Sequence, residues 1–293
     1  MMPAQPRPRR SVLYVPASNA RALVKLSSLA CDTAIIDLED AVMPQDKGAA
    51  RQALSGISAH RQQSRMELVV RINPLSGVWG ADDLKAALAL APDGILLPKV
   101  ETPRDLLEAG DIMDDADAPD TMALWAMVET PRALLNLGAI AELGRDRASR
   151  LSCLVAGTND LVKETGVKAT PDRRYLAPWL MQLVLAAKAG NLDVLDGVFN
   201  DFRDRDAFAQ ECMEGAAMGF SGKTLIHPDQ IAQANFAFAA SPEALAEARA
   251  IVDGFALPEN AGRAVIVIGG RMVERLHLAQ AENLLAKTAR IGN

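Results

Sequence analysis

The chain has 293 residues, of which 49% are hydrophobic and 23% charged, and its formal net charge at neutral pH is -6. A chain of this length and composition can bury a large core within one main domain. Beyond the first ten residues there is no block of Lys and Arg with interleaved aromatic residues, so a nucleic-acid-binding surface is not expected. The expected ligands are small molecules.

The sequence also lacks the segments that would direct it to a membrane. Its basic, Pro-rich start is followed by "SVLYVP", which is too short for a signal peptide, and no apolar run approaches membrane-spanning length. A cytoplasmic protein without membrane contacts is therefore expected. Cys31, Cys153 and Cys212 are widely spaced and form no CxxC pair, which indicates reduced core residues rather than a disulfide framework or a zinc cluster.

Short apolar or β-branched runs recur along the chain, and most gaps between them hold one amphipathic segment of helix length. Continuous apolar strands are typical of a parallel sheet that is covered on its outer face. Eight such β-then-α units favour an α/β fold of the closed (β/α)8 type, a TIM barrel, over an open sheet. The runs begin at Ser11, Thr33, Glu67, Gly94, Ala123, Leu151, Val194 and Lys223.

Two further features concern the helices and the end of the chain. The stretch "TPDRRYLAPWLMQLVLAAKAGN" predicts a helix ending at Gly190, and Pro178 within it leaves two alternatives, a kinked helix or two helices. After the eighth run, "AVIVIGGRMVE" predicts a hairpin and "LHLAQAENLLAKTA" a final amphipathic helix. We therefore expect a barrel domain over 1–228 and a C-terminal helical and hairpin appendage over 229–293, which acts as a lid or an oligomerisation arm.

Polar side chains gather where the apolar runs end. In a barrel these positions are the carboxyl ends of the strands, where active sites lie. The polar residues at these ends are Asp37, Glu39, Asp40, Arg71, Asn73, Lys99, Glu129, Asn159, Asp160, Asn200, Asp201 and His227.

Glu129 ends an otherwise apolar strand, where an unpaired charge is expensive to bury, so it needs a cation. Asp160 follows the neighbouring strand in the small-residue loop "AGTND", and two carboxylates without a nearby His or Cys favour Mg²⁺ over Zn²⁺. The alternative is a structural ion pair of Glu129 with Arg71 or Lys99. Arg71 is otherwise suited to clamp a substrate carboxylate in bidentate fashion.

Two residues at the strand ends have competing interpretations. His227 suits a general base, but Pro228 behind it equally favours a turn histidine. Lys99 suits a Schiff-base lysine, as in metal-free aldolases. The pattern alone does not choose between these interpretations.

The order of motifs resembles that of a known family. The segments that carry the resemblance are "RSVLYVPASNARALVKL", "IIDLEDAVMPQDKGAAR", "VVRINPLSGVWGADDL", "GILLPKVETP", "AMVETPRAL", "GTNDLVKETG", "LDGVFNDFRD" and "GKTLIHPDQI". They resemble, over nearly the whole length, the citrate lyase beta-subunit-like group of the HpcH/HpaI aldolase superfamily, which includes citryl-CoA, malyl-CoA and citramalyl-CoA lyases.

The resemblance implies a Mg²⁺-dependent barrel. In it, Glu129 and Asp160 hold the metal, and Arg71, together with Glu129, binds the 2-oxo acid portion of the substrate. Glu39 and Asp40 are implied to lie nearest the site among the acids of "DLED" and to assist catalysis.

The resemblance also implies a coenzyme A site and a homo-oligomer, most often a trimer. Arg21 and Lys25 match the part of the family that meets the CoA phosphates. Many relatives carry, near the C-terminus, a hairpin Asp that reaches the active site of a neighbouring subunit. This chain departs from that pattern, because Glu274 stands in the corresponding place and leaves the catalytic base open.

These observations predict a lyase that cleaves a 3-hydroxyacyl-CoA into acetyl-CoA, or a close homologue, and a 2-oxo acid. Its substrates would be acyl-CoA esters and 2-oxo acids, and a stand-alone enzyme is favoured over a member of a citrate lyase complex. The alternatives are a Schiff-base aldolase that uses Lys99 and a non-catalytic relative that binds acyl-CoA or oxo acid. The identity of the oxo acid and a companion thioesterase activity stay open.

Overall fold

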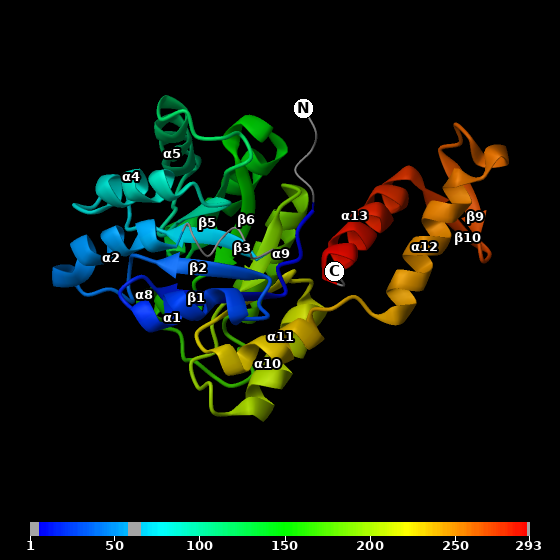
Figure 1. The fold of residues 1–293 in the computed structure, drawn as a ribbon. Helices are drawn as coiled ribbons and strands as arrows, with labels where there is room; N and C mark the ends of the chain where they lie inside the picture. Colours follow the sequence, from blue (N-terminus) through cyan, green and yellow to red (C-terminus); the bar gives the residue numbers. More distant parts are fainter. Residues whose placement is uncertain (1–5, 58–65, 292–293) are drawn as a thin grey trace. The chain divides into compact units, whose positions relative to one another are not determined.

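A computed structural model describes residues 6–57 and 66–291. Its main feature is a closed barrel of eight parallel strands, in which each strand pairs with the next along the chain and the last pairs with the first (Figure 1). This confirms the predicted (β/α)8 fold. The strands are β1 (Ser11–Pro16), β2 (Thr33–Asp37), β3 (Glu67–Arg71), β4 (Gly94–Leu97), β5 (Ala123–Val128), β6 (Leu151–Ala156), β7 (Asp193–Asp196) and β8 (Gly222–Leu225).

Helices connect these strands and surround the barrel (Figure 1). They are α1 (Ala20–Lys25), α2 (Lys47–Ala53), α4 (Gly80–Leu90), α5 (Pro103–Asp115), α6 (Pro131–Leu135), α7 (Leu137–Glu142), α8 (Thr158–Thr165), α9 (Ala177–Ala189), α10 (Arg205–Met218) and α11 (Ile231–Ala237). Neither alternative for Pro178 was right, because α9 begins at Ala177 and places this proline in its first turn, where the missing N–H costs no hydrogen bond.

The strands are buried on both faces, which explains their continuous apolar sequences. Side chains on one face pack against the helices, and those on the other fill the barrel. At the amino end, Arg9 lies 4.5 Å from the ring centroid of Trp125 and forms ion pairs with Glu67 at 2.8 Å and Asp193 at 3.0 Å. The barrel is therefore filled and closed at this end, and a site for small ligands is expected at the carboxyl ends of the strands.

The C-terminal segment forms a second compact unit from Ala239 onward. It consists of α12 (Pro242–Ala256), a hairpin of β9 (Val265–Ile268) and β10 (Arg271–Glu274), and α13 (Arg275–Ile291). The hairpin turns at Gly269 and Gly270, which both have positive φ, as the tight turns of twisted hairpins require. Its core is small and consists of Phe255, Ile266 and Val273.

The division between the two units lies at Phe238 and Ala239, ten residues beyond the boundary expected after residue 228. The reason is α11, which packs on β1 and β8: Asn235 accepts a hydrogen bond from Ser11 at 2.7 Å and donates one to Ala30 O at 2.9 Å. The function of the C-terminal unit as a lid or an oligomerisation arm stays a prediction. Within the described ranges, no helix is both long and apolar enough to cross a lipid bilayer.

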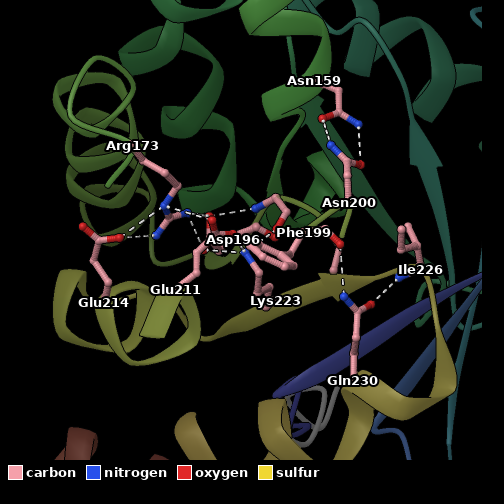
Figure 2. Close-up of polar contacts among 12 residues, drawn as sticks. Asn159, Arg173, Asp196, Phe199, Asn200, Glu211, Glu214, Lys223, Ile226 and Gln230 are labelled. Carbon is pink, nitrogen blue, oxygen red and sulfur yellow. Dashed lines mark hydrogen bonds and ion pairs between the residues drawn. The ribbon is translucent and has the colours of Figure 1, made fainter. Parts of the chain in front are cut away.

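A buried cluster of charges fixes the carboxyl end of β7 against β8 (Figure 2). Asp196, fully buried, accepts hydrogen bonds from Arg173 at 2.8 Å and from Lys223 at 2.9 Å. Lys223 also donates to Gly197 O at 2.5 Å and to Glu211 at 2.7 Å. Arg173 belongs to the loop before α9, so the cluster attaches this loop and the start of the β7 loop to the barrel wall.

Asp196→Asn is expected to lower the free energy of unfolding by about 3–5 kcal/mol, because it removes the fully buried carboxylate among the acids that pair with Arg173 and Lys223. Burial alone would raise the pKa of Asp196, but Lys223 and Arg173 outweigh it and hold the pKa below its ordinary value of 3.8. A carboxylate with a depressed folded-state pKa contributes stability that is complete above its unfolded pKa and is lost as the pH falls through the folded one.

The difference between wild type and Asp196→Asn should therefore be largest at neutral pH and should shrink in acid. Urea denaturation of both proteins at pH 7 and at the lowest pH where the fold persists measures it. Asp172→Asn, which breaks an exposed pair with Arg174, is the matched control and should change stability little. A difference that stays constant with pH would contradict this account.

Candidate active site

Arg71, at the end of β3, is held by Asp37, the last residue of β2, and by two acids that follow this strand. Its Nε and Nη2 donate to the two carboxylate oxygens of Asp37 at 2.7 and 2.6 Å, a geometry favoured by the pairing of these two residues across β2 and β3. Its Nη1 lies 2.9 Å from Glu39 Oε2 and 3.7 Å from Asp40. The guanidinium also lies 4.8 Å from the ring centroid of Tyr14.

This arrangement limits how Arg71 can bind a substrate carboxylate. The side edge of the guanidinium, formed by Nε and Nη2, is occupied by Asp37, so a bidentate contact with a substrate carboxylate can use only the terminal edge formed by Nη1 and Nη2. Among the described residues, the ion pairs of Arg71 are with the acids at and after the end of β2 and do not include Glu129. The alternative of a structural pair between Arg71 and Glu129 is not observed.

Glu39 is buried beside Arg71, with 4% of its surface exposed. The contact of Nη1 with Oε2 is close enough for an ion pair but lacks hydrogen-bond geometry, so Oε2 has no hydrogen-bond donor within the described part of the chain. Burial raises the pKa of Glu39 to about 7 against the attraction of Arg71, and Asp40 and Asp37 add repulsion. Glu39 thus lies where a further positive charge or a proton would be stabilised.

Lys47 is a structural residue of the site that the sequence analysis missed. Its ammonium is buried and donates to Leu38 O at 2.6 Å, Glu39 O at 2.7 Å and Asn73 Oδ1 at 3.0 Å, which uses its three N–H groups. Burial lowers its pKa, although nearby acids oppose this effect. Lys47 therefore fixes the backbone that carries Glu39. This role could not be predicted from the sequence, because a lysine on a short helix is usually an exposed surface residue.

Glu129 follows β5 and is 1% exposed. Its Oε1 accepts a hydrogen bond from the backbone N–H of Lys99 at 2.8 Å. On its other side lies Gly157, where an added Cβ would come within 2.3 Å of Glu129 Cβ, so this loop approaches closely only because it has no side chain. Burial raises the pKa of Glu129 to about 8, and repulsion from Glu39 and Asp160 adds to this effect.

Asp160 lies in the first turn of α8, half-buried, and is close enough to Glu129 and Lys99 to affect the pKa of each. Among the described residues, no three acids, histidines or cysteines converge as a complete metal-binding cluster. Glu129 and Asp160 would therefore supply two carboxylates and leave the remaining positions to other oxygen ligands. This incomplete set of oxygen donors fits a hard divalent cation such as Mg²⁺.

The loops after β6, β7 and β8 are joined by side-chain amides (Figure 2). Asn159, next to Asp160, exchanges two hydrogen bonds with Asn200, at 2.8 and 3.2 Å. Gln230 donates to Phe199 O at 3.0 Å and accepts from the N–H of Ile226 at 3.0 Å. The pair of Asn159 and Asn200 thus joins the first turn of α8, which carries Asp160, to the loop after β7, and Gln230 joins that loop to the end of β8.

His227 is a turn residue in the structure. Its Nδ1 accepts a hydrogen bond from the N–H of Asp229 at 3.2 Å, and its ring stacks on Phe202 with 4.4 Å between centroids. Nδ1 of His227 thus caps the turn that follows it. The turn interpretation of the sequence therefore describes the observed contacts.

Three other residues singled out by the sequence are exposed on the surfaces of their own units. Arg21 and Lys25 are exposed on α1. Glu274 is exposed at the end of β10 in the C-terminal unit, and its N–H donates to His277 Nδ1 at 2.9 Å. Their functions stay predictions.

Comparison with known proteins identifies relatives over nearly the whole chain. Residues 10–228 match the family model described as HpcH/HpaI aldolase/citrate lyase. A (3S)-malyl-CoA thioesterase of Cereibacter sphaeroides is 40% identical over 290 residues, which cover 99% of this chain and 98% of that protein. The mitochondrial citramalyl-CoA lyase of Homo sapiens is 32% identical, with 94% of this chain and 84% of that protein covered.

A solved structure resembles the whole chain. It is the protein CitE from Mycobacterium tuberculosis in complex with magnesium, acetoacetate and coenzyme A. It is 29% identical, with a TM-score of 0.71 and coverage of 98% of this chain and 99% of that one. The similarity thus extends beyond the barrel to the C-terminal segment.

Proposed function

Because the chain belongs to the HpcH/HpaI aldolase/citrate lyase family, we propose that it is a Mg²⁺-dependent carbon–carbon lyase. Its substrate would be a 3-hydroxyacyl-CoA, and its products acetyl-CoA, or a close homologue, and a 2-oxo acid. The observation that carries the proposal is the burial of Glu129 near Glu39 and Asp160, which raises its pKa to about 8. Carboxylates crowded in this way create a site that a divalent cation stabilises.

The proposed roles of the residues follow from their positions. Glu129 and Asp160 would hold the ion, which when bound polarises substrate oxygens and stabilises the negative charge that develops on them. Arg71 would bind the carboxylate of the oxo-acid portion through its terminal edge, while Asp37 holds the side edge. Glu39 and Asp40 would orient that terminal edge and the water around it.

Cleavage requires a base that takes the proton of the substrate hydroxyl. The bond between the hydroxyl-bearing carbon and the carbon next to the thioester then breaks, and its electron pair passes to the thioester as an enolate, which is protonated to the acyl-CoA product. The proposed base is Glu274 from another subunit of a homo-oligomer, most simply a trimer. Arg21 and Lys25 would contact the phosphates of coenzyme A.

A Schiff-base aldolase that uses Lys99 is disfavoured by electrostatics. Burial lowers the pKa of Lys99, but Glu39, Glu129 and Asp160 outweigh it, and the net effect raises the pKa above its ordinary value. A Schiff-base lysine needs the opposite shift, since only the neutral amine attacks a carbonyl. A non-catalytic relative is disfavoured because Arg71, Glu129 and Asp160 are all present.

A second candidate is hydrolysis of the thioester. The observation in its favour is the 40% identity to a (3S)-malyl-CoA thioesterase over nearly the full length of both chains. Both reactions would start from the same type of substrate and differ in the bond that breaks. A lyase releases a 2-oxo acid and keeps the thioester, whereas a thioesterase releases free CoA and a hydroxy acid.

Product analysis tests both candidates. Purified protein with malyl-, citramalyl- or citryl-CoA and Mg²⁺ is expected to release a 2-oxo acid, measured as its phenylhydrazone, in equal amount to acetyl-CoA. Chelation by EDTA should stop the reaction. Release of free thiol without oxo acid would replace the lyase proposal by the thioesterase, and turnover that persists in EDTA would contradict the metal.

Glu129→Gln and Asp160→Asn serve as variants in the same assay. Each removes one of two charged ligands and is expected to weaken Mg²⁺ binding and turnover by at least about a hundredfold. Calorimetric titration with Mg²⁺ measures the affinity independently of activity. Wild-type affinity in either variant would exclude that residue as a ligand.

Arg71→Lys is expected to weaken binding of the 2-oxo acid by at least about tenfold, because a single ammonium cannot pair with Asp37 and also present a second edge to a carboxylate. The matched control is Arg10→Lys, which alters an equivalent fork, between Arg10 and Asp32 at 2.8 Å, before β1. Both variants should lose stability, but only Arg71→Lys should lose oxo-acid affinity in a titration. Equal losses in both would mean that Arg71 is only structural.

Glu274→Ala should depress turnover and leave the affinities for Mg²⁺ and oxo acid nearly unchanged, if Glu274 supplies the base across a subunit interface. A mixture of inactive Glu274→Ala with inactive Glu129→Gln should then regain part of the activity, because some interfaces pair an intact metal site with an intact Glu274. Mass spectrometry must show that subunits have exchanged. No recovery after exchange would mean that Glu274 acts within its own chain or not at all.

A further inference from the structure

Lys99 has a backbone conformation that lysine rarely adopts. Its φ is +52°, in the left-handed region, where a side chain is strained and where Gly or Asn is usual. A strained residue persists only where surrounding structure requires its conformation, and such residues cluster at functional sites. Lys99 lies two residues after β4, at the carboxyl end of the barrel.

In this conformation the Lys99 N–H donates a hydrogen bond to Glu129 Oε1 at 2.8 Å. It is a bond from a backbone donor to a buried carboxylate, and such bonds are short and strong. It also opposes the rise in the pKa of Glu129 that burial causes. On the other side lies Gly157, where an added Cβ would lie 2.8 Å from Oε2, so only a residue without a side chain leaves Oε2 its position.

The side chain of Lys99 does not explain the strain. It is exposed, and within residues 6–57 and 66–291 no hydrogen bond or ion pair joins its ammonium to another group. What the left-handed conformation secures is therefore the direction of the main chain.

We propose that Lys99 is a positioning residue that acts on Glu129 through its backbone. The strained turn after β4 fixes Oε1 of Glu129 and leaves Oε2 as the oxygen that would bind the divalent cation. This inference rests on the proposed function, in which Glu129 is a metal ligand. It predicts that the tolerance of residue 99 for positive φ, rather than its charge, determines metal affinity.

The test is a series of four neutral variants, Lys99→Gly, Lys99→Asn, Lys99→Ala and Lys99→Val. All remove the ammonium, but they differ in their tolerance of the left-handed region, which falls from Gly and Asn through Ala to the β-branched Val. In calorimetric titrations of the metal-free proteins, the Gly and Asn variants should bind Mg²⁺ equally well. The Ala variant should bind a few fold more weakly, and the Val variant about tenfold more weakly or worse.

A matched control exists at the other end of the same strand. Ala91, at the end of α4 and before β4, also has a φ of +52°. Ala91→Gly and Ala91→Val should change the midpoint of thermal unfolding in the metal-free protein in the same directions as the corresponding Lys99 variants, without changing Mg²⁺ affinity. Should Lys99→Val fail to fold, the comparison of the Gly and Ala variants still decides the question.

The outcomes separate this inference from the proposed function. Equal Mg²⁺ affinities in the four Lys99 variants, with affinity lost in Glu129→Gln, would overturn the positioning role and leave Glu129 as a ligand. Unchanged affinity in Glu129→Gln would overturn the metal assignment itself. In a Glu129→Gln background, the order of affinities among the Lys99 variants should disappear, and its persistence would also refute the mechanism.

Discussion

The buried negative charge of Glu129 is the constraint on which the arrangement of the barrel mouth, the region at the carboxyl ends of the strands, depends. A carboxylate with 1% of its surface exposed loses its hydration, and Glu39 and Asp160 add repulsion, so that its pKa rises to about 8. The chain offsets this cost with one backbone hydrogen bond from Lys99 and supplies no ion pair to Glu129 among the described residues. A site that only had to be stable would place an arginine there, as the chain does for Asp37 and Asp196.

Much of the fold could be predicted from the sequence because one physical rule determines it. Strands covered on both faces must be apolar throughout, so eight continuous runs located eight barrel strands. The same rule located the mouth, because a charge at the end of such a run has to lie where water or a ligand can reach it. Arg71, Glu129 and Asp160 were selected as candidate site residues in this way.

The partners of these residues could not be found in this way, since they depend on register and backbone direction. Asp37 occupies the side edge of Arg71 because the two residues are paired across β2 and β3, a relation that no local pattern contains. Lys47 donates hydrogen bonds to two backbone carbonyl groups, which are present whatever side chains the residues carry, so the sequence does not reveal these contacts. The strain at Lys99 is likewise a property of the main chain, and a lysine in the sequence does not predict a left-handed conformation.

The pairing of Arg71 with Asp37 has a consequence for the order in which ligands bind. The carboxyl ends of the strands carry five acids, Asp37, Glu39, Asp40, Glu129 and Asp160, against three basic residues, Lys47, Arg71 and Lys99, so the formal charge there is negative when all five acids are ionised. An oxo acid and a CoA ester are themselves anions, and they meet this field before they reach the guanidinium. If the site binds a divalent cation as proposed, the cation would enter first and neutralise this excess of negative charge. The kinetics would then be those of an ordered reaction in which metal is an obligatory first ligand rather than an activator that can join at any stage.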